Sequence, residues 1–135
     1  MKSPIVQSTS AITLAGGGPF GRRDLGLCLR RAPVVVAADG GADRLIRLGV
    51  MPTAVIGDFD SLSPRARMEI PQSRQHVVPE QVTTDFDKAL RSIDAPLVLA
   101  LGFAGARLDH GLAAFSTLIA RAERRCILIG PQDLA

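Results

Sequence analysis

Short, almost continuous apolar runs alternate along the chain with stretches in which apolar residues recur every three or four positions. Such runs between turn residues are typical of buried strands, and the three-to-four spacing is typical of helices. The runs predict six strands, over residues 11–15, 34–39, 53–58, 75–79, 97–102 and 126–130. The spacing predicts helices between them, over residues 19–31, shortly after residue 40, from residue 63, around 86–93 and from residue 109.

Residues that favour helix ends support several of these boundaries. Pro19 suits the first turn of a helix, and Gly49 suits a C-terminal cap. Ser63 followed by Pro64 is typical of an N-cap and a first helical residue. Ile93 continues the helical spacing of the apolar residues before it, so we expect it to lie in the fourth helix.

The strand pattern also indicates how the sheet is built. Strands that are apolar throughout are covered on both faces, which favours a parallel sheet. Regular alternation with helices predicts a three-layer α/β/α, Rossmann-like fold with a mostly parallel sheet of about six strands. The length of 135 residues, without an internal repeat or a linker, is that of one domain, over residues 1–135.

Polar and glycine-rich clusters follow five of the predicted strands. In an open parallel sheet, ligands bind beyond the carboxyl ends of the strands, so we expect these clusters to share one site. The clusters are Gly16, Gly17 and Gly18; Asp39, Gly40 and Gly41; Asp58 and Asp60; Thr83, Thr84 and Asp85; and residues 102–111.

The most specific of these clusters is the GDFDS segment, in which Asp58 and Asp60 stand one residue apart at the end of an apolar strand. In an extended chain these two carboxylates project to the same side, where their charges repel unless a cation lies between them. Aspartates from several loops, with few His and no nearby Cys, are oxygen donors that suit Mg²⁺ or Mn²⁺. Because Mg²⁺ shares its coordination with phosphates, the pattern predicts an enzyme acting on a phosphorylated or nucleotide substrate.

Each of these polar residues also has a purely structural interpretation. Asp39, Asp58 and Asp60 are common turn formers. Asp85 and Lys88 are spaced as a surface ion pair on a helix, and Thr84 with Asp87 resembles a capping box. Asp109 could cap its helix, and His110 could be an ordinary residue at the helix end.

Composition narrows the class of protein. A formal charge of +3 suits an anionic ligand, but the chain has no Trp, no Tyr and no dense basic run, which argues against nucleic acid. No apolar run approaches a membrane span, and the first residues lack a signal-peptide core, so we expect a cytoplasmic protein. Cys28 and Cys126 have no metal-ligand spacing and are predicted to be buried thiols.

Gly16, Gly18 and Gly21 also fit the GxGxxG pattern of dinucleotide-binding proteins, with Asp39 about 20 residues further on. Pro19 lies inside this pattern. A nicotinamide site, moreover, gives no role to the aspartates after the other strands. We therefore regard this interpretation as the weaker one.

Four segments together resemble the successive motifs of the thiamine pyrophosphokinase (thiamine diphosphokinase) family. They are ADGGADRL, PTAVIGDFDSL, PEQVTTDFDKAL and GARLDHGLAAFSTL, and they extend from residue 38 to residue 118. The resemblance implies transfer of a pyrophosphoryl group from ATP to the hydroxyl of thiamine, giving thiamine diphosphate and AMP. It also implies Mg²⁺ as cofactor, ATP and thiamine as the small-molecule partners, and a homodimer.

Carried onto this sequence, the resemblance implies a role for each site residue. Asp58, Asp60 and Asp85 would hold Mg²⁺ on the triphosphate, with Asp39 close by, and Lys88 would face the phosphates. Asp58 or Asp85 would accept the hydroxyl proton, and Gln81 would lie near thiamine. The expected ATP-binding residues are Gly16, Gly17, Gly18, Asp39, Gly40, Gly41, Thr84, Arg107, Asp109 and His110.

Two features depart from the family pattern. Asp43 stands where the family usually has Asn, and its charge either weakens a phosphate contact or faces solvent. Family members also carry a C-terminal all-β domain that helps to form the thiamine site. We expect that domain to be absent from these 135 residues, and thiamine binding to be weak if the chain is truly this short.

Two other functions remain open at this stage. One is a Mg²⁺- or Mn²⁺-dependent phosphohydrolase that uses the same aspartates. The other is a non-catalytic dinucleotide-binding module that needs no metal and tolerates Asp58→Asn.

Overall fold

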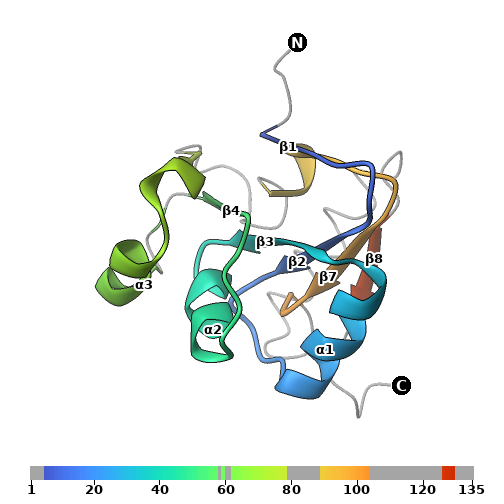
Figure 1. Cartoon of the computed structure of the whole chain (residues 1–135), viewed down its shortest axis with the longest axis horizontal. Helices are drawn as coiled ribbons and strands as arrows, with labels where there is room; N and C mark the ends of the chain where they lie inside the picture. The colour runs from blue at the N-terminus through green and yellow to red at the C-terminus, as the bar shows by residue number, and fades with distance from the viewer. Residues whose placement is uncertain (1–4, 58, 60–61, 79–88, 104–125, 130–135) are drawn as a thin grey trace.

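The computed structural model describes residues 5–57, 59, 62–78, 89–103 and 126–129. Its centre is a parallel sheet of six strands in the order β5-β4-β3-β2-β7-β8 (Figure 1). The strands are β2 (Ile12–Ala15), β3 (Val34–Ala38), β4 (Ala54–Gly57), β5 (Gln75–Val77), β7 (Val98–Leu101) and β8 (Cys126–Ile129). All six predicted strands and their parallel pairing are therefore confirmed.

Two strands end one residue earlier than predicted, for a reason visible in the backbone. Asp39 has a φ of 44° and Gly102 has a φ of 83°, so neither residue can continue an extended strand. Each turn begins at the first residue after the last apolar position. The chain thus leaves the sheet abruptly at the edge where the candidate site residues were predicted.

The described helices are α1 (Arg22–Arg31), α2 (Gly41–Arg47), α3 (Pro64–Glu69) and the 3₁₀ turn η1 (Gln72–Arg74). Ser63 caps α3 as predicted, because its Oγ accepts a hydrogen bond from the Ala66 amide at 3.1 Å. Gly49 follows α2 with a φ of 82°, in agreement with its predicted role at the helix end. The expectation for Pro19 was wrong, since α1 begins three residues later, after the extended Gly21.

Alternate residues of each strand divide the core between the two faces of the sheet. On one face, Ala15, Ala37, Val55 and Leu101 pack with residues of α1, α2 and α3, including Leu25. On the other face, Leu14, Val36, Ile56 and Ala100 pack with Val6, Leu90 and Ile93. Figure 1 shows α1 and α2 below the sheet and the strand β1 above it.

A second, two-stranded parallel sheet was not predicted. It pairs β1 (Val6–Gln7) with β6 (Ile93–Asp94). Ile93 is buried, as its apolar character indicated, but it lies in this strand and not in a helix. The reason is a pairing with a distant segment: residues 89–91 are helical, and the Ser92 carbonyl then accepts hydrogen bonds from the Ile5 and Val6 amides at 2.8 and 3.0 Å.

The predicted helix from residue 109 and the start of the predicted fourth helix lie outside the described residues. Cys28 is buried in α1, whereas Cys126 in β8 is only partly buried, and both are free thiols. Burial raises the pKa of both, that of Cys126 to about 11. Among the described helices, none combines the length and the apolar character that crossing a membrane requires.

Candidate active site

The strand order places a topological switch point at the centre of the sheet. From β2 the chain runs outward through β3, β4 and β5, and it then returns to the other side of β2 to add β7 and β8. The connections that leave β2 and β7 therefore diverge, and in open α/β sheets this is where a ligand crevice forms. The loop Gly16–Gly18 leaves β2, and the segment that starts at Gly102 leaves β7.

These two loops touch through their backbones. The Gly16 amide donates to the Leu101 carbonyl at 2.7 Å, and the Gly18 amide donates to the Gly102 carbonyl at 2.8 Å. A Cβ atom on Gly18 would lie 2.6 Å from the Gly102 oxygen, and one on Gly102 would lie 2.6 Å from the Gly16 oxygen. No side chain fits at either position, so the switch point requires glycine on both loops.

Gly17 is the exposed member of this loop, and its nearest neighbour across the site is Gly40. A Cβ atom on Gly17 would meet only the Gly40 backbone, at 3.9 Å. The glycine loop thus lies beside the segment that follows β3, and an incoming ligand could approach the backbone of both. The two glycine clusters therefore lie at one edge of the sheet, as expected, whereas their role in binding a ligand stays a prediction.

Asp39 occupies the turn between β3 and α2. Its side chain is buried, with 1% exposure, and its backbone is in the left-handed region with a φ of 44°. The Asp39 amide donates to the Ile56 carbonyl at 3.0 Å, and its carbonyl accepts from the Ala42 amide at 3.1 Å. Aspartate is one of the few non-glycine residues that adopt this conformation readily, so the turn fits both interpretations of Asp39, and its functional role stays a prediction.

The start of α2 is docked directly on the end of β2. A Cβ atom on Gly41 would lie 2.0 Å from the carbonyl oxygen of Ala15. Only glycine at position 41 therefore allows α2 to approach β2 this closely. The contact fixes α2 next to Asp39 and the glycine loop. Sequence reasoning assigned Gly41 to ligand binding only, and this packing role had no signal in the sequence.

The segment 57–63, called the aspartate loop below, begins at the end of β4, where Gly57 lies beside Asp39. Gly57, at the end of β4, has a φ of 152°, and a Cβ atom there would lie 3.1 Å from the Cβ of Asp39. Phe59, the residue between the two predicted metal ligands, is buried and has a φ of 68°. Its carbonyl accepts a hydrogen bond from Arg67 of α3 at 3.3 Å, and the Arg67 guanidinium lies 5.7 Å from its ring centre.

Nine of the predicted site residues lie outside the described residues, so their predicted roles remain predictions. They are Asp58, Asp60, Gln81, Thr84, Asp85, Lys88, Arg107, Asp109 and His110. Within the described part of the chain, no group of three or more His, Cys, Asp or Glu side chains could hold a metal ion. Of the predicted metal ligands, only Asp39 is placed.

Two neighbouring residues of α2 make contacts that sequence reasoning missed. Asp43 is half-buried and accepts hydrogen bonds from both the amide and the Oγ of Ser63, so it does not simply face solvent. Arg44 donates to the Phe20 carbonyl at 3.3 Å, and its guanidinium lies 5.4 Å from the Phe20 ring centre. The Nε of Arg44 is buried without a hydrogen-bond partner in the described part of the chain.

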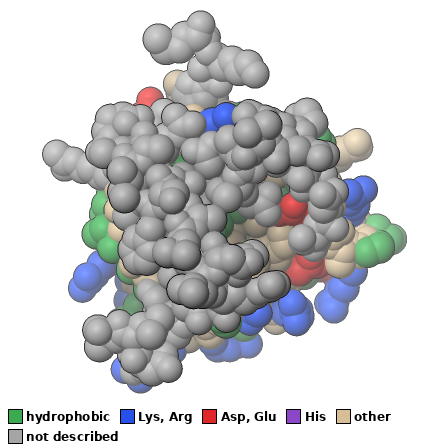
Figure 2. All heavy atoms as spheres, turned by 180° about the vertical axis from the view of Figure 1, so that it is seen from behind, with side chains coloured by type: hydrophobic (Ala, Val, Ile, Leu, Met, Phe, Trp, Pro, Cys, Tyr) green, Lys and Arg blue, Asp and Glu red, His purple; other side chains and the backbone are tan. Residues whose placement is uncertain are grey.

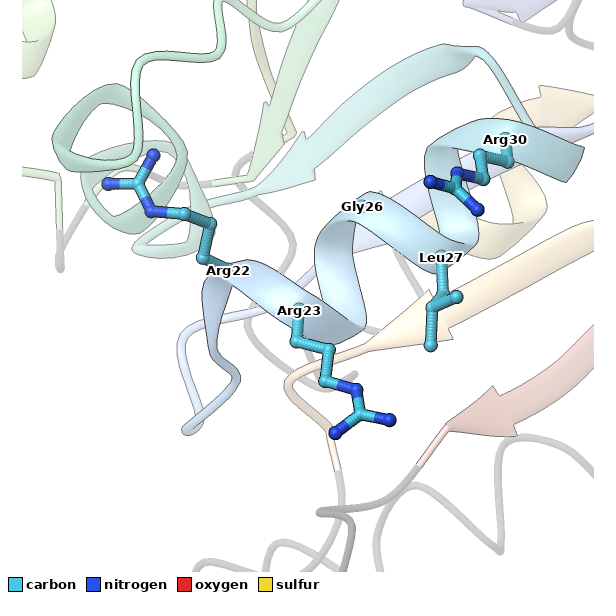
Figure 3. A pocket seen from close by; sticks show the side chains of 5 residues that line it. All are labelled: Arg22, Arg23, Gly26, Leu27 and Arg30. Atoms are coloured by element: carbon cyan, nitrogen blue, oxygen red, sulfur yellow. The ribbon is translucent and has the colours of Figure 1, made fainter.

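A hollow of about 350 Å³ lies elsewhere, on the outer face of α1 (Figure 3), and is lined by Arg22, Arg23, Gly26, Leu27 and Arg30. Figure 3 shows that Arg22 and Arg23 extend in different directions, with Arg30 two turns further along the helix. The guanidinium groups do not converge, so the hollow is not built to hold a phosphate. Figure 2 shows Arg side chains along the lower edge of the molecule, at the end where α1 and α2 lie.

Comparison with known proteins identifies the family. Residues 25–129 match the family described as thiamin pyrophosphokinase, catalytic domain. The chain belongs to this family. The match includes Asp39, Gly40, Gly41 and the aspartate loop, so the family resemblance of the four sequence motifs is confirmed.

Solved structures of the family share this fold. A thiamine pyrophosphokinase from Bacillus subtilis is 26% identical with a TM-score of 0.69, and the match covers 89% of this chain and 60% of that one. A thiamin pyrophosphokinase from Geobacillus thermodenitrificans is 27% identical with a TM-score of 0.68, covering 89% and 59% of the two chains.

A more distant thiamin pyrophosphokinase, from Candida albicans, is 16% identical with a TM-score of 0.70, covering 91% of this chain and 60% of that one. At this identity the likeness concerns the fold alone. The 135-residue chain spans about 60% of the length of these relatives.

Proposed function

We propose that this chain is the ATP-binding, catalytic part of a thiamine pyrophosphokinase. The reaction would move a pyrophosphoryl group from ATP to the hydroxyl of thiamine, giving thiamine diphosphate and AMP. The observation that carries the proposal is the family match over residues 25–129. It is supported by the glycine loops that meet at the switch point beside the buried Asp39.

The residues of this chain would act mainly by positioning the substrates, which is the main need of phosphoryl-transfer chemistry. The glycine loop and Gly40 leave room for the triphosphate to approach the backbone. Lys88, Arg107 and His110 would contact the phosphates or the nucleotide, together with Thr84 and Asp109, and Gln81 would lie near thiamine. These assignments follow from the family motifs in the sequence.

Mg²⁺ fits the donor set of the proposed site. Asp39 offers a buried carboxylate at the carboxyl edge of the sheet, and Asp58, Asp60 and Asp85 would supply further hard oxygen donors. When bound, the ion would neutralise the charge of the phosphates.

The bond changes of the proposed reaction balance without a further reactant. The hydroxyl oxygen of thiamine forms a bond to the β-phosphorus of ATP, and the bond from that phosphorus to the oxygen bridging to the α-phosphate breaks. AMP departs with the electron pair of the broken bond. The hydroxyl proton passes to Asp58 or Asp85, either of which is a plausible base by the family motifs.

The proposal also includes the layers of the fold, the oligomeric state and the cellular location. The apolar clusters on both faces of the sheet support a three-layer, Rossmann-like arrangement. The family resemblance supports residues 1–135 as one α/β domain, and assembly as a homodimer. The cytoplasmic location rests on the apolar pattern of the sequence alone.

The structure also bears on the alternative of a dinucleotide-binding module. In that class the third glycine of GxGxxG allows the helix to pack closely on the strand. A Cβ atom on Gly21 would meet none of the described residues within 4 Å, so this glycine shows no such packing role in the described part of the chain. We therefore prefer the pyrophosphokinase.

The test combines calorimetric ATP binding with an AMP-release assay, each with and without Mg²⁺ and thiamine. Both are measured on the 135-residue chain and, if the reading frame is longer, on its full product. Asp39→Asn and Asp58→Asn are compared with Asp94→Asn, an exposed aspartate at the far side of the fold. We expect Mg²⁺-dependent ATP binding, and thiamine-dependent AMP release that both site variants lose and the control keeps.

Two results would overturn the proposal. Phosphate release from ATP without thiamine would indicate a phosphohydrolase. Binding of NAD that needs no metal and survives Asp58→Asn would indicate a dinucleotide-binding module.

A further inference from the structure

The side chain of Asp43 links two helices that flank the candidate site. Its Oδ2 accepts from the Ser63 amide at 3.1 Å, and its Oδ1 accepts from the Ser63 hydroxyl. The same hydroxyl oxygen accepts from the Ala66 amide at 3.1 Å, as the N-cap of α3. One carboxylate thus holds α2 to the first turn of α3 through both donors of a single serine.

Ser63 is also the end of the aspartate loop. The loop begins at Gly57, whose carbonyl accepts from the Val78 amide at 2.8 Å, next to β5. In its middle, Phe59 is buried and is held by Arg67 of α3. Gly57, Phe59 and Ser63, which flank the two predicted metal ligands in the sequence, are thus each held by a contact with a neighbouring segment.

These contacts connect the aspartate loop, through Asp43 and α2, to the turn that contains Asp39. The helix that carries Asp43 begins two residues after Asp39 and is docked on β2 through Gly41. We propose that Asp43 is a positioning residue, which sets the aspartate loop relative to Asp39 and the glycine loop. This inference rests on the proposed function, because the positions matter only if those aspartates act together.

The chemistry of the contact predicts how substitutions should rank. A carboxylate offers two acceptor oxygens, which match the N–H and O–H donors of Ser63. An asparagine can still accept from the amide, and its NH₂ can donate to the free lone pair of the hydroxyl. Asn at position 43 should therefore keep the link, whereas Ala should lose it.

The alternative, that Asp43 repels a phosphate, predicts the opposite ranking. If the charge weakened a phosphate contact, Asp43→Asn would raise the affinity for ATP and the rate. If Asp43 positions the loop, Asp43→Asn would leave the rate within about threefold, and Asp43→Ala would lower it about 10- to 100-fold, as expected for misplaced reacting groups.

The experiment measures thiamine-dependent AMP release at saturating ATP for Asp43→Ala, Asp43→Asn, Ser63→Ala and the variant with both alanines. The matched control is Asp24→Ala, which removes an aspartate from the first turn of α1. The melting temperature of each variant is measured first, and the assay is run at a temperature at which every variant is folded. We expect the two single alanine variants to lose rate, Asp43→Asn to restore it, and the double variant to be no worse than the poorer single one.

A rate for Asp43→Ala within twofold of the wild type would overturn the inference, as would Asp43→Asn exceeding the wild type. So would losses that multiply in the double variant, because independent effects do not share a contact. In each of these cases the wild-type chain is active and the proposed function stands. Absence of thiamine-dependent AMP release from the full product of the reading frame removes the proposed function itself, and this inference with it.

Discussion

Replacing Gly41 by alanine tests whether α2 is docked directly on the end of β2. The added Cβ atom would lie 2.0 Å from the Ala15 carbonyl oxygen and 2.6 Å from its carbonyl carbon. Contacts of Cβ atoms closer than 3.0 Å are essentially never found, so the atoms must separate by at least 3.0 − 2.0 = 1.0 Å. Because the neighbour is the backbone of a central strand, no side-chain rotation can relieve the contact.

The expected loss of stability follows from two opposing terms. Overpacking of this kind costs up to about 3 kcal/mol when the backbone must move. The better helix propensity of alanine returns about 0.5–1 kcal/mol, which leaves a net loss of about 2 kcal/mol. For a chain of 135 residues, 1 kcal/mol corresponds to about 3–4 °C in the melting temperature, so we expect a decrease of about 7 °C.

Gly26 provides a matched control, since it is also a helical glycine. A Cβ atom on Gly26 would lie within 4 Å of no residue that the structure describes, and Gly26 is exposed in the middle of α1. Gly26→Ala should therefore raise the melting temperature by about 2–3 °C through helix propensity alone. The assay is thermal unfolding followed by circular dichroism, with both variants and the wild type in one buffer.

The reasoning would be refuted by equal shifts in the two variants, or by a Gly41→Ala chain that melts with the wild type. Either result would mean that α2 does not approach β2 as closely as the contacts at Gly41 indicate. A loss of ATP binding in Gly41→Ala at a temperature where the chain is folded would add a functional measure of the same displacement.

Four further predictions concern Arg44, Gly49 and Cys126. Arg44→Met removes the hydrogen bond and the cation–π contact to Phe20, so the free energy of unfolding in urea should fall by about 1–2 kcal/mol, and an unchanged midpoint would contradict this. Gly49→Ala places a side chain at a φ of 82° and should lower the melting temperature by about 3–4 °C, unless α2 can end differently. Burial raises the pKa of Cys126 from 9.0 to about 11, so iodoacetamide at pH 8.5 should alkylate it on the order of 100-fold more slowly in the folded chain than in urea. Since the unfolded chain loses this proton first, stability should also fall as the pH rises from 9 towards 11, and Cys126→Ala should flatten that pH dependence of the melting temperature.

Most strands of the main sheet could be predicted because they are almost continuous apolar runs, a pattern that the sequence displays locally, whereas β5 begins with Gln75 and His76 and shows this pattern only weakly. The pair of β1 and β6 could not, because a two-residue strand shows no periodicity and its partner lies more than 80 residues away. Ile93 illustrates the ambiguity. Its apolar side chain fits the spacing of a helix and the core side of a strand equally well, and only the pairing with Val6 decides between them.

The glycines and Asp39 could be assigned to one edge of the sheet because parallel strands present their carboxyl ends on the same side. Their neighbours could not be assigned, because these depend on strand order. Only the observed order puts the loop after β2 on one side of the β3–α2 turn and the loop after β4 on the other. The contacts of Asp43 with Ser63 and of Arg44 with Phe20 follow from that order, which no local pattern reveals.

These two contacts also explain why a helix of seven residues can organise the site. Consecutive side chains of an α-helix point about 100° apart, so Asp43 and Arg44 contact different neighbouring segments. Asp43 holds the aspartate loop, and Arg44 holds the end of the glycine loop at Phe20. Both loops are thus fixed to one short element, which is itself fixed to β2 at Gly41. A displacement of α2 must move the two sides of the proposed site together, which is why a single methyl group at Gly41 should disturb contacts on both.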